Sequence, residues 1–351
     1  MQDPKTQTAR AGRYGRLLIL WVCAIALAGC SPRDEPIRVS GPAQGTTFNV
    51  TVMSPDGVDQ ASVASAVQRV IDTVDDQMST WRDDSEISRF NRAPAGEWVP
   101  VSGDLAKITR QALALGRQTN GAFDVTLGPI LKVWGFGAGA DVPSKLPTTE
   151  TLNAAREKTG IGQIDVRMEP PALRKKVDGI TLDLAGLAQG YTVDRIADAL
   201  RQLGAEHFLA ELGGELYAQG TKESDKPWRI GVEKPEAGVR TIERVVGLAD
   251  AGMTTSGDYR DYFELDGHRF SHTIDPRTGR PVAHDLRAVT VIAQDAMTAD
   301  AMATALLVMG PEAGLRYANA NGIAALFVRG NDDAYTESNS KAFEPYLKEA
   351  P

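Results

Sequence analysis

The sequence predicts an α+β fold of mostly antiparallel sheets with flanking helices. Two observations carry this prediction. Turn-forming pairs at Gly213-Gly214 and Asp266-Gly267 separate strand-like runs, as is typical of β-hairpins. Stretches with apolar residues at helical spacing occur between and around these runs. Hairpins mixed with helices favour antiparallel sheets and argue against a doubly wound parallel sheet.

The N-terminal residues resemble a bacterial lipoprotein signal peptide. Four basic residues precede an apolar run from Leu17 to Ala28, which is too short to span a bilayer as a mature helix. The run ends in LAGC, which resembles the lipobox, where cleavage precedes an acylated cysteine. We therefore expect a signal peptide at residues 1–29, a lipidated tether at 30–45 and a periplasmic protein held at the inner or outer membrane by lipid on Cys30. The alternative is a buried helix with a chance cysteine.

Charge and cysteine content restrict the class of partner. Cleavage would remove Cys23 and leave Cys30 alone, which excludes a disulfide framework and a thiolate metal site. It would also make the formal net charge of −8 three units more negative, because residues 1–29 hold four basic residues and one acidic residue. This charge disfavours nucleic acid and anionic lipid as partners, so membrane contact is expected through the lipid anchor alone.

Residues 46–351 are expected to form a single domain. A strand is predicted within residues 46–53, a helix within 58–81 and a second helix over 105–118. Residues 139–175 are rich in Gly, Pro and charge, so we interpret them as a surface insertion with one short helix within 148–160.

The second half is more regular. The pattern predicts a strand at residues 179–184 followed by a helix at 192–204. Hairpins follow at residues 207–220 and 261–274. The last predicted elements are a strand at 286–294, a helix at 296–310 and a strand at 323–330.

Asp300 and Thr304 form the first candidate site. At positions i and i+4 of a helix, their side chains lie on one face. A carboxylate and a hydroxyl are oxygen donors, which Mg²⁺ uses together with phosphate oxygens and water. The alternative is that they are solvated polar residues in the first turns of the helix.

His272 is the second candidate, at the end of a predicted hairpin strand and just before a tight turn at residues 275–279. A histidine near its ordinary pKa can take a proton from an attacking hydroxyl. A structural role for a single strand histidine is the alternative.

The third candidate is LDLAGLAQGY, residues 182–191. Asp183 closes a predicted strand, Gly186 and Gly190 allow close approach of the backbone, and the following helix would offer its positive N-terminus to an anion. The stretch matches neither standard glycine-loop motif for phosphate. Residues 119–137 add Phe123, Trp134 and Phe136, which would form either a ring-binding wall or part of the core.

Taken together, these segments resemble the FAD:protein FMN transferase family, the ApbE-like flavin transferases. The resemblance rests on MSTWRDDSEISRFN, GAFDVTLGPILKVWGFG, LDLAGLAQGY, TSGDYRDYFELDGHRFSHTIDPRTGRPV and ADAMATALLVMG, in the order of that family and behind a lipoprotein signal. It implies a fold with a T-fold-related core. It also implies a Mg²⁺-dependent enzyme that moves the FMN part of FAD onto a Ser or Thr hydroxyl of an acceptor protein and releases AMP.

The resemblance also implies roles for individual residues. Metal ligands would be the Gly186 carbonyl, Asp300 and Thr304, and the catalytic base would be His272. The residues expected to contact FAD are Gln44, Trp81, Ala122, Phe123, Asp124, Asp183, Gln189, Ser256 and Ser271. The acceptor would be a membrane or exported redox subunit.

Two positions depart from the family pattern. Gln44 replaces a usual Met, and Gln189 replaces a usual Lys or Glu, so we expect altered FAD affinity with intact metal chemistry. Two further functions use the same residues: an FAD pyrophosphatase, in which water attacks and FMN and AMP are released, and a flavin-binding lipoprotein without turnover.

Overall fold

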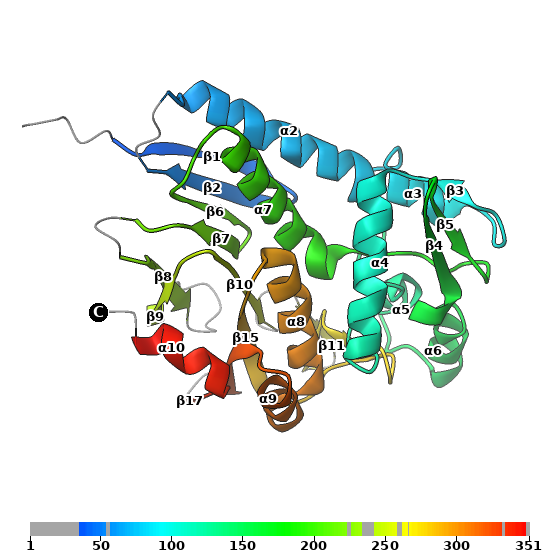
Figure 1. Cartoon of the computed structure of the whole chain (residues 1–351). Helices are drawn as coiled ribbons and strands as arrows, with labels where there is room; N and C mark the ends of the chain where they lie inside the picture. The colour runs from blue at the N-terminus through cyan, green and yellow to red at the C-terminus, as the bar shows by residue number, and fades with distance from the viewer. Residues whose placement is uncertain are drawn as a thin grey trace, which may run out of the picture. The chain divides into compact units, whose positions relative to one another are not determined.

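The computed structural model describes residues 35–53, 57–222, 226–233, 242–257, 262–265, 267–331 and 334–348. The predicted signal peptide, the lipobox and Cys30 therefore lie outside the described residues. Residues from Ile37 onward form one compact unit, whose described elements are drawn in Figure 1.

An eight-stranded sheet forms the centre of this unit (Figure 1), in the order β1-β2-β6-β7-β10-β15-β16-β17. Every neighbouring pair is antiparallel. The predicted α+β class is therefore confirmed. The strands are β1 (Ile37–Ala43), β2 (Thr46–Val52), β6 (Phe208–Leu212), β7 (Glu215–Gln219), β10 (Ala251–Gly257), β15 (Leu286–Ala293), β16 (Ala324–Asn331) and β17 (Ala334–Asn339).

The sheet begins earlier in the chain than predicted. The expected tether at residues 30–45 contains β1, which pairs with β2 along its whole length, from Ile37 opposite Val52 to Ala43 opposite Thr46. The prediction was wrong here because Pro and charged residues flank a short alternating run, and an edge strand tolerates them. Gln44 and Gly45 form the turn, both with positive φ.

Opposite faces of the sheet pack against different elements. Tyr217 packs on the helical side, whereas its neighbours Leu216 and Ala218 pack on the other side. The helices on the first side are α2 (Gln60–Met78), α7 (Ala185–Gln202), α8 (Ala296–Met309) and α9 (Pro311–Ala320). The other side is covered by β8 (Trp228–Glu233), β9 (Ile242–Leu248), η2 (Lys341–Phe343) and α10 (Glu344–Lys348).

A smaller layer packs beside the end of α2 and around α4 (Gly103–Gln118) (Figure 1). It contains α3 (Glu86–Arg92) and a three-stranded sheet of β3 (Val99–Pro100), β5 (Pro171–Lys175) and β4 (Ile164–Met168). The predicted insertion at 139–175 is therefore wrong in its second half, where Leu173 is fully buried in the core. Polar residues alternate with apolar ones along the hairpin of β4 and β5, so the overall composition of the segment does not indicate a buried hairpin.

The remaining elements connect α4 to the late hairpin. They are α5 (Gly128–Val133), α6 (Thr149–Arg156), η1 (Ile161–Gln163), β11 (Tyr262–Leu265), β12 (His268–Ser271), β13 (Ile274–Asp275) and β14 (Arg280–Pro281). Trp134 is buried among them and donates its indole N–H to the Gly279 carbonyl at 2.8 Å. Trp134 is thus a core residue, and the ring-binding alternative is wrong for it.

The segment before α7 differs from its prediction. Residues 179–184 form no strand, and α7 begins at Ala185 rather than at residue 192. Gly186 and Gly190 therefore belong to the first turns of a helix instead of a loop. A glycine pair lowers helix propensity, but packing of α7 on its neighbours outweighs this loss.

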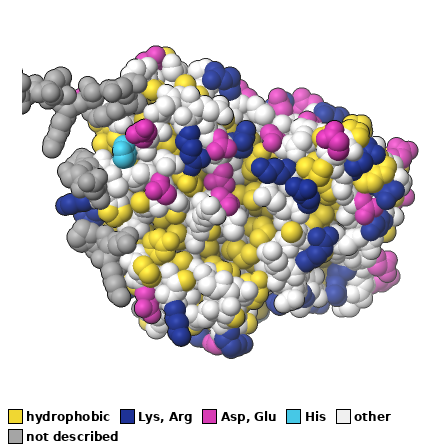
Figure 2. Space-filling view, in the orientation of Figure 1, with side chains coloured by type: hydrophobic (Ala, Val, Ile, Leu, Met, Phe, Trp, Pro, Cys, Tyr) yellow, Lys and Arg dark blue, Asp and Glu magenta, His cyan; other side chains and the backbone are white. Residues whose placement is uncertain are grey.

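Figure 2 shows basic and acidic side chains interspersed over one face of the protein. None of the helices in the described ranges is long and apolar enough to cross a membrane.

Candidate active site

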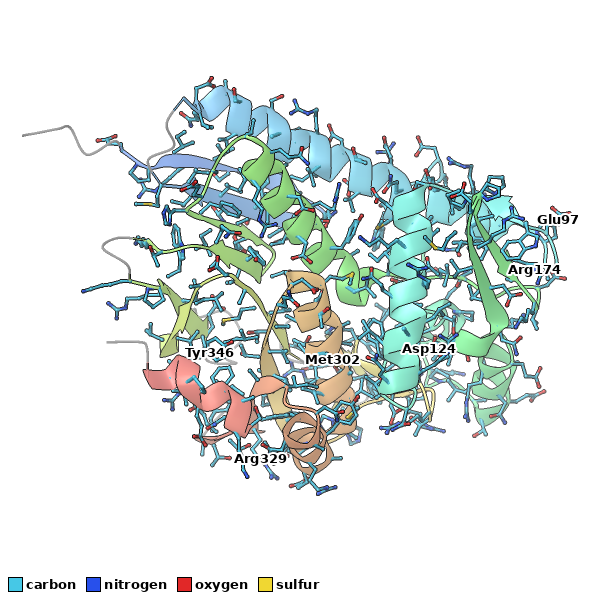
Figure 3. All side chains as sticks on the ribbon, viewed as in Figure 1. Glu97, Asp124, Arg174, Met302, Arg329 and Tyr346 are labelled. Carbon is cyan, nitrogen blue, oxygen red and sulfur yellow. The ribbon has the colours of Figure 1, made fainter. Side chains whose placement is uncertain are left out.

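A cavity of about 380 Å³ opens where α7, α8, β10, the end of α4 and the segment after β12 meet. Residues from four of the predicted segments line it together. The predicted site residues that line it are Ala122, Phe123, Asp124, Asp183, Gly186, Gln189, Ser256, His272, Asp300 and Thr304. Asp124, which Figure 3 labels near the end of α4, contributes a carboxyl group from the turn that follows this helix.

A second cavity of about 700 Å³ adjoins the first, because Asp183, Ala185 and Gln189 line both. Gln44 and Trp81 line the second cavity. Trp81 is 76% exposed, which is unusual for an indole ring without a partner. Two joined cavities of this size suit an elongated ligand that carries rings at its ends.

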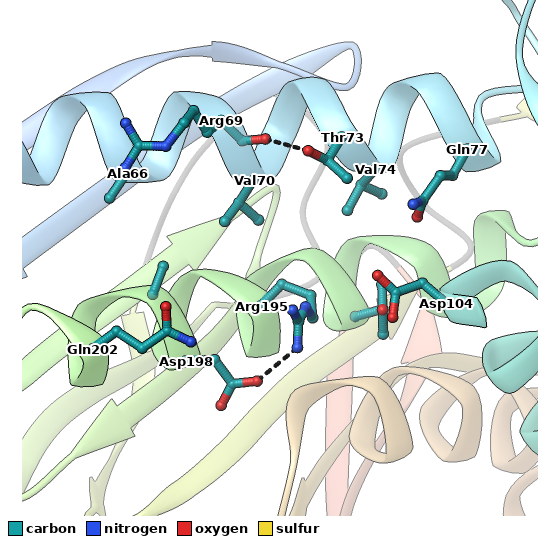
Figure 4. Close-up of a pocket in the computed structure, with 12 residues that line it drawn as sticks. Ala66, Arg69, Val70, Thr73, Val74, Gln77, Asp104, Arg195, Asp198 and Gln202 are labelled. Atoms are coloured by element: carbon teal, nitrogen blue, oxygen red, sulfur yellow. Dashed lines mark hydrogen bonds and ion pairs between the residues drawn. The ribbon is translucent and has the colours of Figure 1, made fainter. Parts of the chain in front are cut away.

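Ser271 does not join this group. Its buried hydroxyl accepts the Thr273 N–H at 3.1 Å, and it lines a different cavity. A further cavity of about 330 Å³, drawn in Figure 4, lies between α2 and α7. It mixes cations and carboxylates such as Arg195 and Asp198, which form an ion pair at 3.0 Å, and it contains none of the predicted site residues.

Asp300 is buried on α8 rather than solvated, so the solvated alternative is wrong for it. One carboxylate oxygen accepts the Gly190 N–H of α7 at 3.2 Å. One turn further along, the Thr304 hydroxyl lies 3.2 Å from the Ser256 hydroxyl on β10. Helical spacing thus places the two oxygens on one face, as predicted, and that face is turned toward α7 and β10.

The glycines of α7 allow the close contact between α7 and α8. A Cβ atom at Gly190 would lie 2.5 Å from the Ala296 carbonyl oxygen, so any side chain there would force the helices apart. A Cβ atom at Gly186 would lie 3.7 Å from the Thr304 hydroxyl and 3.2 Å from the Phe123 ring. The glycines therefore bring the backbone of α7 against Asp300 and Thr304.

Four carboxyl residues line the central cavity, Asp124, Asp183, Glu215 and Asp300, and His272 is the one basic residue among its described lining residues. Burial raises the pKa of Asp124, Asp183 and Asp300, because a charged carboxylate is poorly solvated there. Asp124 is held by the Thr126 hydroxyl at 2.6 Å, and Asp183 by the Ala185 N–H at 2.9 Å. A bound cation would offset this negative charge.

The donor set fits Mg²⁺. Among the described residues, no three His, Cys, Asp or Glu side chains are close enough to enclose a metal ion. Mg²⁺ needs no such enclosure, because it commonly takes one or two carboxylates and completes its coordination with waters and ligand phosphates. Asp300, Thr304 and the backbone at Gly186 supply hard oxygen donors of this kind.

His272 follows β12 and lines the central cavity together with Asp300 and Thr304 of α8. The edge of its ring meets Phe136, with ring centroids 6.4 Å apart. The predicted tight turn after it is confirmed, because the Gly279 N–H donates to the Asp275 carbonyl at 2.8 Å. This turn sets the direction in which the chain leaves His272.

Asn91 is a residue of the site region that sequence reasoning missed. Its side chain donates to the Leu182 carbonyl at 2.9 Å and accepts the Leu182 N–H at 2.7 Å, and therefore replaces the missing strand partner of residues 179–184. The buried Lys175 ammonium donates to the Asn91 carbonyl at 2.8 Å. These bonds fix the segment that carries Asp183 into the cavity.

We expect Asn91→Ala to lower the free energy of unfolding by about 1–3 kcal/mol, because two partly buried backbone groups lose their partner. FAD affinity should fall as well, since Asp183 would be less well positioned. Urea unfolding and FAD titration measure the two effects. Asn153→Ala, at an exposed position on α6, is the control and should change neither. If Asn91→Ala kept the wild-type free energy of unfolding and the wild-type affinity for FAD, Asn91 would not hold this segment.

Asp194 was also missed. From α7 its carboxylate accepts the Ala296 N–H at 2.8 Å and the Met297 N–H at 2.9 Å, which are the first backbone donors of α8. Asp295 accepts the Thr298 N–H at 2.7 Å. The start of α8 is thus tied to α7, and this sets the position of the face that carries Asp300. Asp194 lies outside the central cavity, so no motif for ligand chemistry points to it.

Burial raises the pKa of Asp194 to about 7. Between pH ~4 and pH ~7 the folded state therefore keeps a proton that the unfolded state has lost, and the free energy of unfolding should fall as pH rises through this window. Asp194→Asn should make the decrease smaller in metal-free protein, as measured by urea unfolding across the window, and the raised pKa of Asp300 should account for part of what remains. Asp198→Asn, with a half-exposed side chain on the same helix, should retain the whole decrease. An unchanged slope in Asp194→Asn would contradict the assignment.

A model of the ApbE family matches residues 44–327, which include every residue of the central cavity. The chain belongs to the ApbE family. The FAD:protein FMN transferase of Vibrio cholerae is 41% identical over 332 residues, covering 93% of this chain and 98% of that relative. The FAD:protein FMN transferase of Escherichia coli K12 is 33% identical over 338 residues, covering 93% and 96%.

Solved ApbE structures have the same fold. The flavin transferase ApbE from Vibrio cholerae superposes with a TM-score of 0.81 at 39% identity, covering 89% of this chain and 99% of that chain. The apo form of the flavinyl transferase ApbE from Pseudomonas stutzeri gives a TM-score of 0.82 at 38% identity, covering 91% and 98%. The resemblance on which the sequence prediction rests is thereby confirmed.

Proposed function

We propose that this ApbE protein transfers the FMN part of FAD to a hydroxyl group of another protein. The curated relatives carry the name of this activity over nearly the full length of the chain. In the reaction, the acceptor oxygen forms a bond to the FMN phosphorus, the bond from that phosphorus to the bridging oxygen breaks, and AMP leaves with the bridging oxygen. The acceptor residue is a Ser or Thr of a membrane or exported redox subunit.

One observation carries the proposal at the level of the site. Asp300 and Thr304 meet the backbone of α7 in a cavity that His272 also lines. Hard oxygen donors and a candidate base thus lie around one space, as transfer of a phosphoryl group to a hydroxyl requires.

Asp300, Thr304 and the Gly186 carbonyl would hold Mg²⁺. When bound, the metal neutralises charge on the pyrophosphate, a role that the acidic cavity lining does not perform alone. Burial of Asp300 keeps water from competing for its oxygen, and the Gly190 N–H orients its carboxylate. Carboxyl groups from α8 and from the segment before α7 line the same cavity as the His272 imidazole, so all of them can contact one ligand.

His272 acts as the general base. It accepts the proton of the acceptor hydroxyl as the oxygen attacks phosphorus. Phe136 packs against the edge of the ring and restricts its orientation. FAD binds across the two joined cavities, in contact with Phe123, Asp183 and Gln189, and reaches Gln44 and Trp81 at the far end.

The protein is exported and lipid-anchored through Cys30 in the periplasm, as the sequence of the first thirty residues indicates. Cys30→Ser should prevent incorporation of labelled palmitate and release the protein from membranes. Retention of label in this variant would disprove acylation at Cys30.

The activity is tested by incubating the purified full chain with FAD, Mg²⁺ and a candidate acceptor fragment. Nucleotides are followed by chromatography and the acceptor by mass. AMP release with an FMN-sized mass gain on the acceptor is the expected result. AMP and free FMN with unmodified acceptor would instead identify a pyrophosphatase, and intact FAD retained by the protein would identify a flavin carrier.

A further inference from the structure

A third cavity, of about 390 Å³, lies beside the candidate base. Ser271 lines this cavity, whereas the next residues, His272, Thr273 and Ile274, line the central one. One short segment is therefore the wall between the two spaces. The third cavity contains no residue to which a role in FAD or metal binding was assigned, apart from Ser271.

The third cavity is basic, in contrast to the chain as a whole. Basic side chains reach it from β12, β14, the following loop and β15, and none of its described lining residues is acidic. The basic residues are Arg269, Arg280, His284 and Arg287. The full sequence has 46 acidic and 38 basic residues, so this lining reverses the overall charge. It would attract an anionic group to a protein that otherwise repels one.

His284 gives a second, independent indication of a ligand. Both of its ring nitrogens are buried, and neither has a hydrogen-bond partner within the described part of the chain. Gly310 packs against the ring, where a Cβ atom would lie 3.0 Å from the Cδ2 atom. Polar groups in such positions are normally satisfied by protein, water or ligand. A bound acidic group would supply the missing partner.

The floor of the cavity is apolar and rigid. The Trp134 ring is stacked on Phe270 with centroids 5.8 Å apart, and the Gly279 carbonyl holds its indole N–H. Pro281 and Val282 complete the floor. A short carbon chain that ends in a carboxylate matches an apolar floor with basic walls.

We propose that this cavity binds an acidic side chain of the acceptor protein, close to the hydroxyl that is modified at His272. This inference rests on the proposed function, because it takes the macromolecular partner to be the acceptor. The acceptor must bring a hydroxyl to His272, so residues that flank this hydroxyl pass over the wall formed by Ser271. An Asp or Glu there would reach the basic cavity, and the enzyme would prefer acceptors with acidic flanks.

Two synthetic peptides test the inference. Each is fluorescein-labelled and contains one Thr, flanked by Asp in one peptide and by Asn in the other. Fluorescence anisotropy measures the dissociation constant of each peptide with the full chain at low salt. Mass gain on the peptides and AMP release from FAD are measured in parallel. The variants are Arg280→Gln and His284→Gln, and the control is Arg229→Gln, an exposed charge on β8 that lines none of the described cavities.

The wild-type protein should bind the Asp peptide about tenfold more tightly than the Asn peptide, as one charge-assisted hydrogen bond provides. Arg280→Gln and His284→Gln should reduce this ratio to near one, whereas Arg229→Gln should keep it. An equal affinity of the wild-type protein for both peptides, or a ratio that survives in both cavity variants, would overturn the inference. AMP release is scored separately, so a failure of the proposed function would be seen independently of the binding ratio.

Discussion

Asp300→Ala is expected to abolish Mg²⁺-dependent AMP release from FAD. Asp300 is the one carboxylate on α8 that faces the cavity, and its removal leaves the metal with a hydroxyl and a backbone carbonyl as protein ligands. A catalytic metal contributes several kcal/mol of transition-state stabilisation, so kcat/KM should fall by about 10²–10⁴. The measurement is AMP release as a function of Mg²⁺ concentration, compared with wild type.

Folding must be separated from metal binding in this test. Burial raises the pKa of Asp300, so the charged carboxylate lowers the free energy of unfolding of the metal-free protein. Asp300→Asn lacks this charge and should therefore fold at least as well as wild type. Mg²⁺ should raise the melting temperature of wild type and leave that of Asp300→Asn unchanged. If AMP release in either variant depended on Mg²⁺ as it does in wild type, Asp300 would not be a metal ligand.

His272→Ala is expected to retain FAD binding and to slow FMN transfer. His272 follows β12 and belongs to neither α7 nor α8, so its loss should leave the metal-binding residues in place. Loss of a general base costs about 10²–10⁴ in rate. The expected pattern is a lower kcat for acceptor modification with an unchanged dissociation constant for FAD.

A pH profile distinguishes a base from a structural residue. The pH dependence of the transfer rate should differ between wild type and His272→Ala, because the variant lacks the group that accepts the proton of the acceptor hydroxyl. Phe136→Leu, which changes the ring packed against His272, is the matched control and should keep the wild-type pH dependence at a lower rate. A wild-type profile in His272→Ala would place the base elsewhere.

Local patterns were sufficient to predict most helices and hairpins. The helix that carries Asp300 and Thr304 and the hairpin that leads to His272 lie as predicted, because apolar spacing and turn residues act over a few neighbouring positions. The pairing of these two oxygens on one helix face follows from helical geometry alone. Family membership was also predicted from motif order, and the comparisons confirm it.

Other features depended on contacts between distant residues. Residues 179–184 look like a strand, yet their partner is the Asn91 side chain, about ninety positions earlier. Gly186 and Gly190 look like a phosphate loop, yet they begin a helix, because their lack of side chains lets α7 pack on α8. Asp194 carries no motif, and its importance appears only where its carboxylate meets the start of α8.

The sequence by itself thus determined the fold class, most elements and the chemical types of the site residues, since each of these depends on local spacing. Tertiary structure decided which of those residues share a cavity, the burial that raises the pKa of their carboxyl groups, and the position of Ser271 on the far side of the wall beside His272. These properties arise from the packing of α7, α8 and β12, which are far apart in the chain, and no local pattern specifies such contacts.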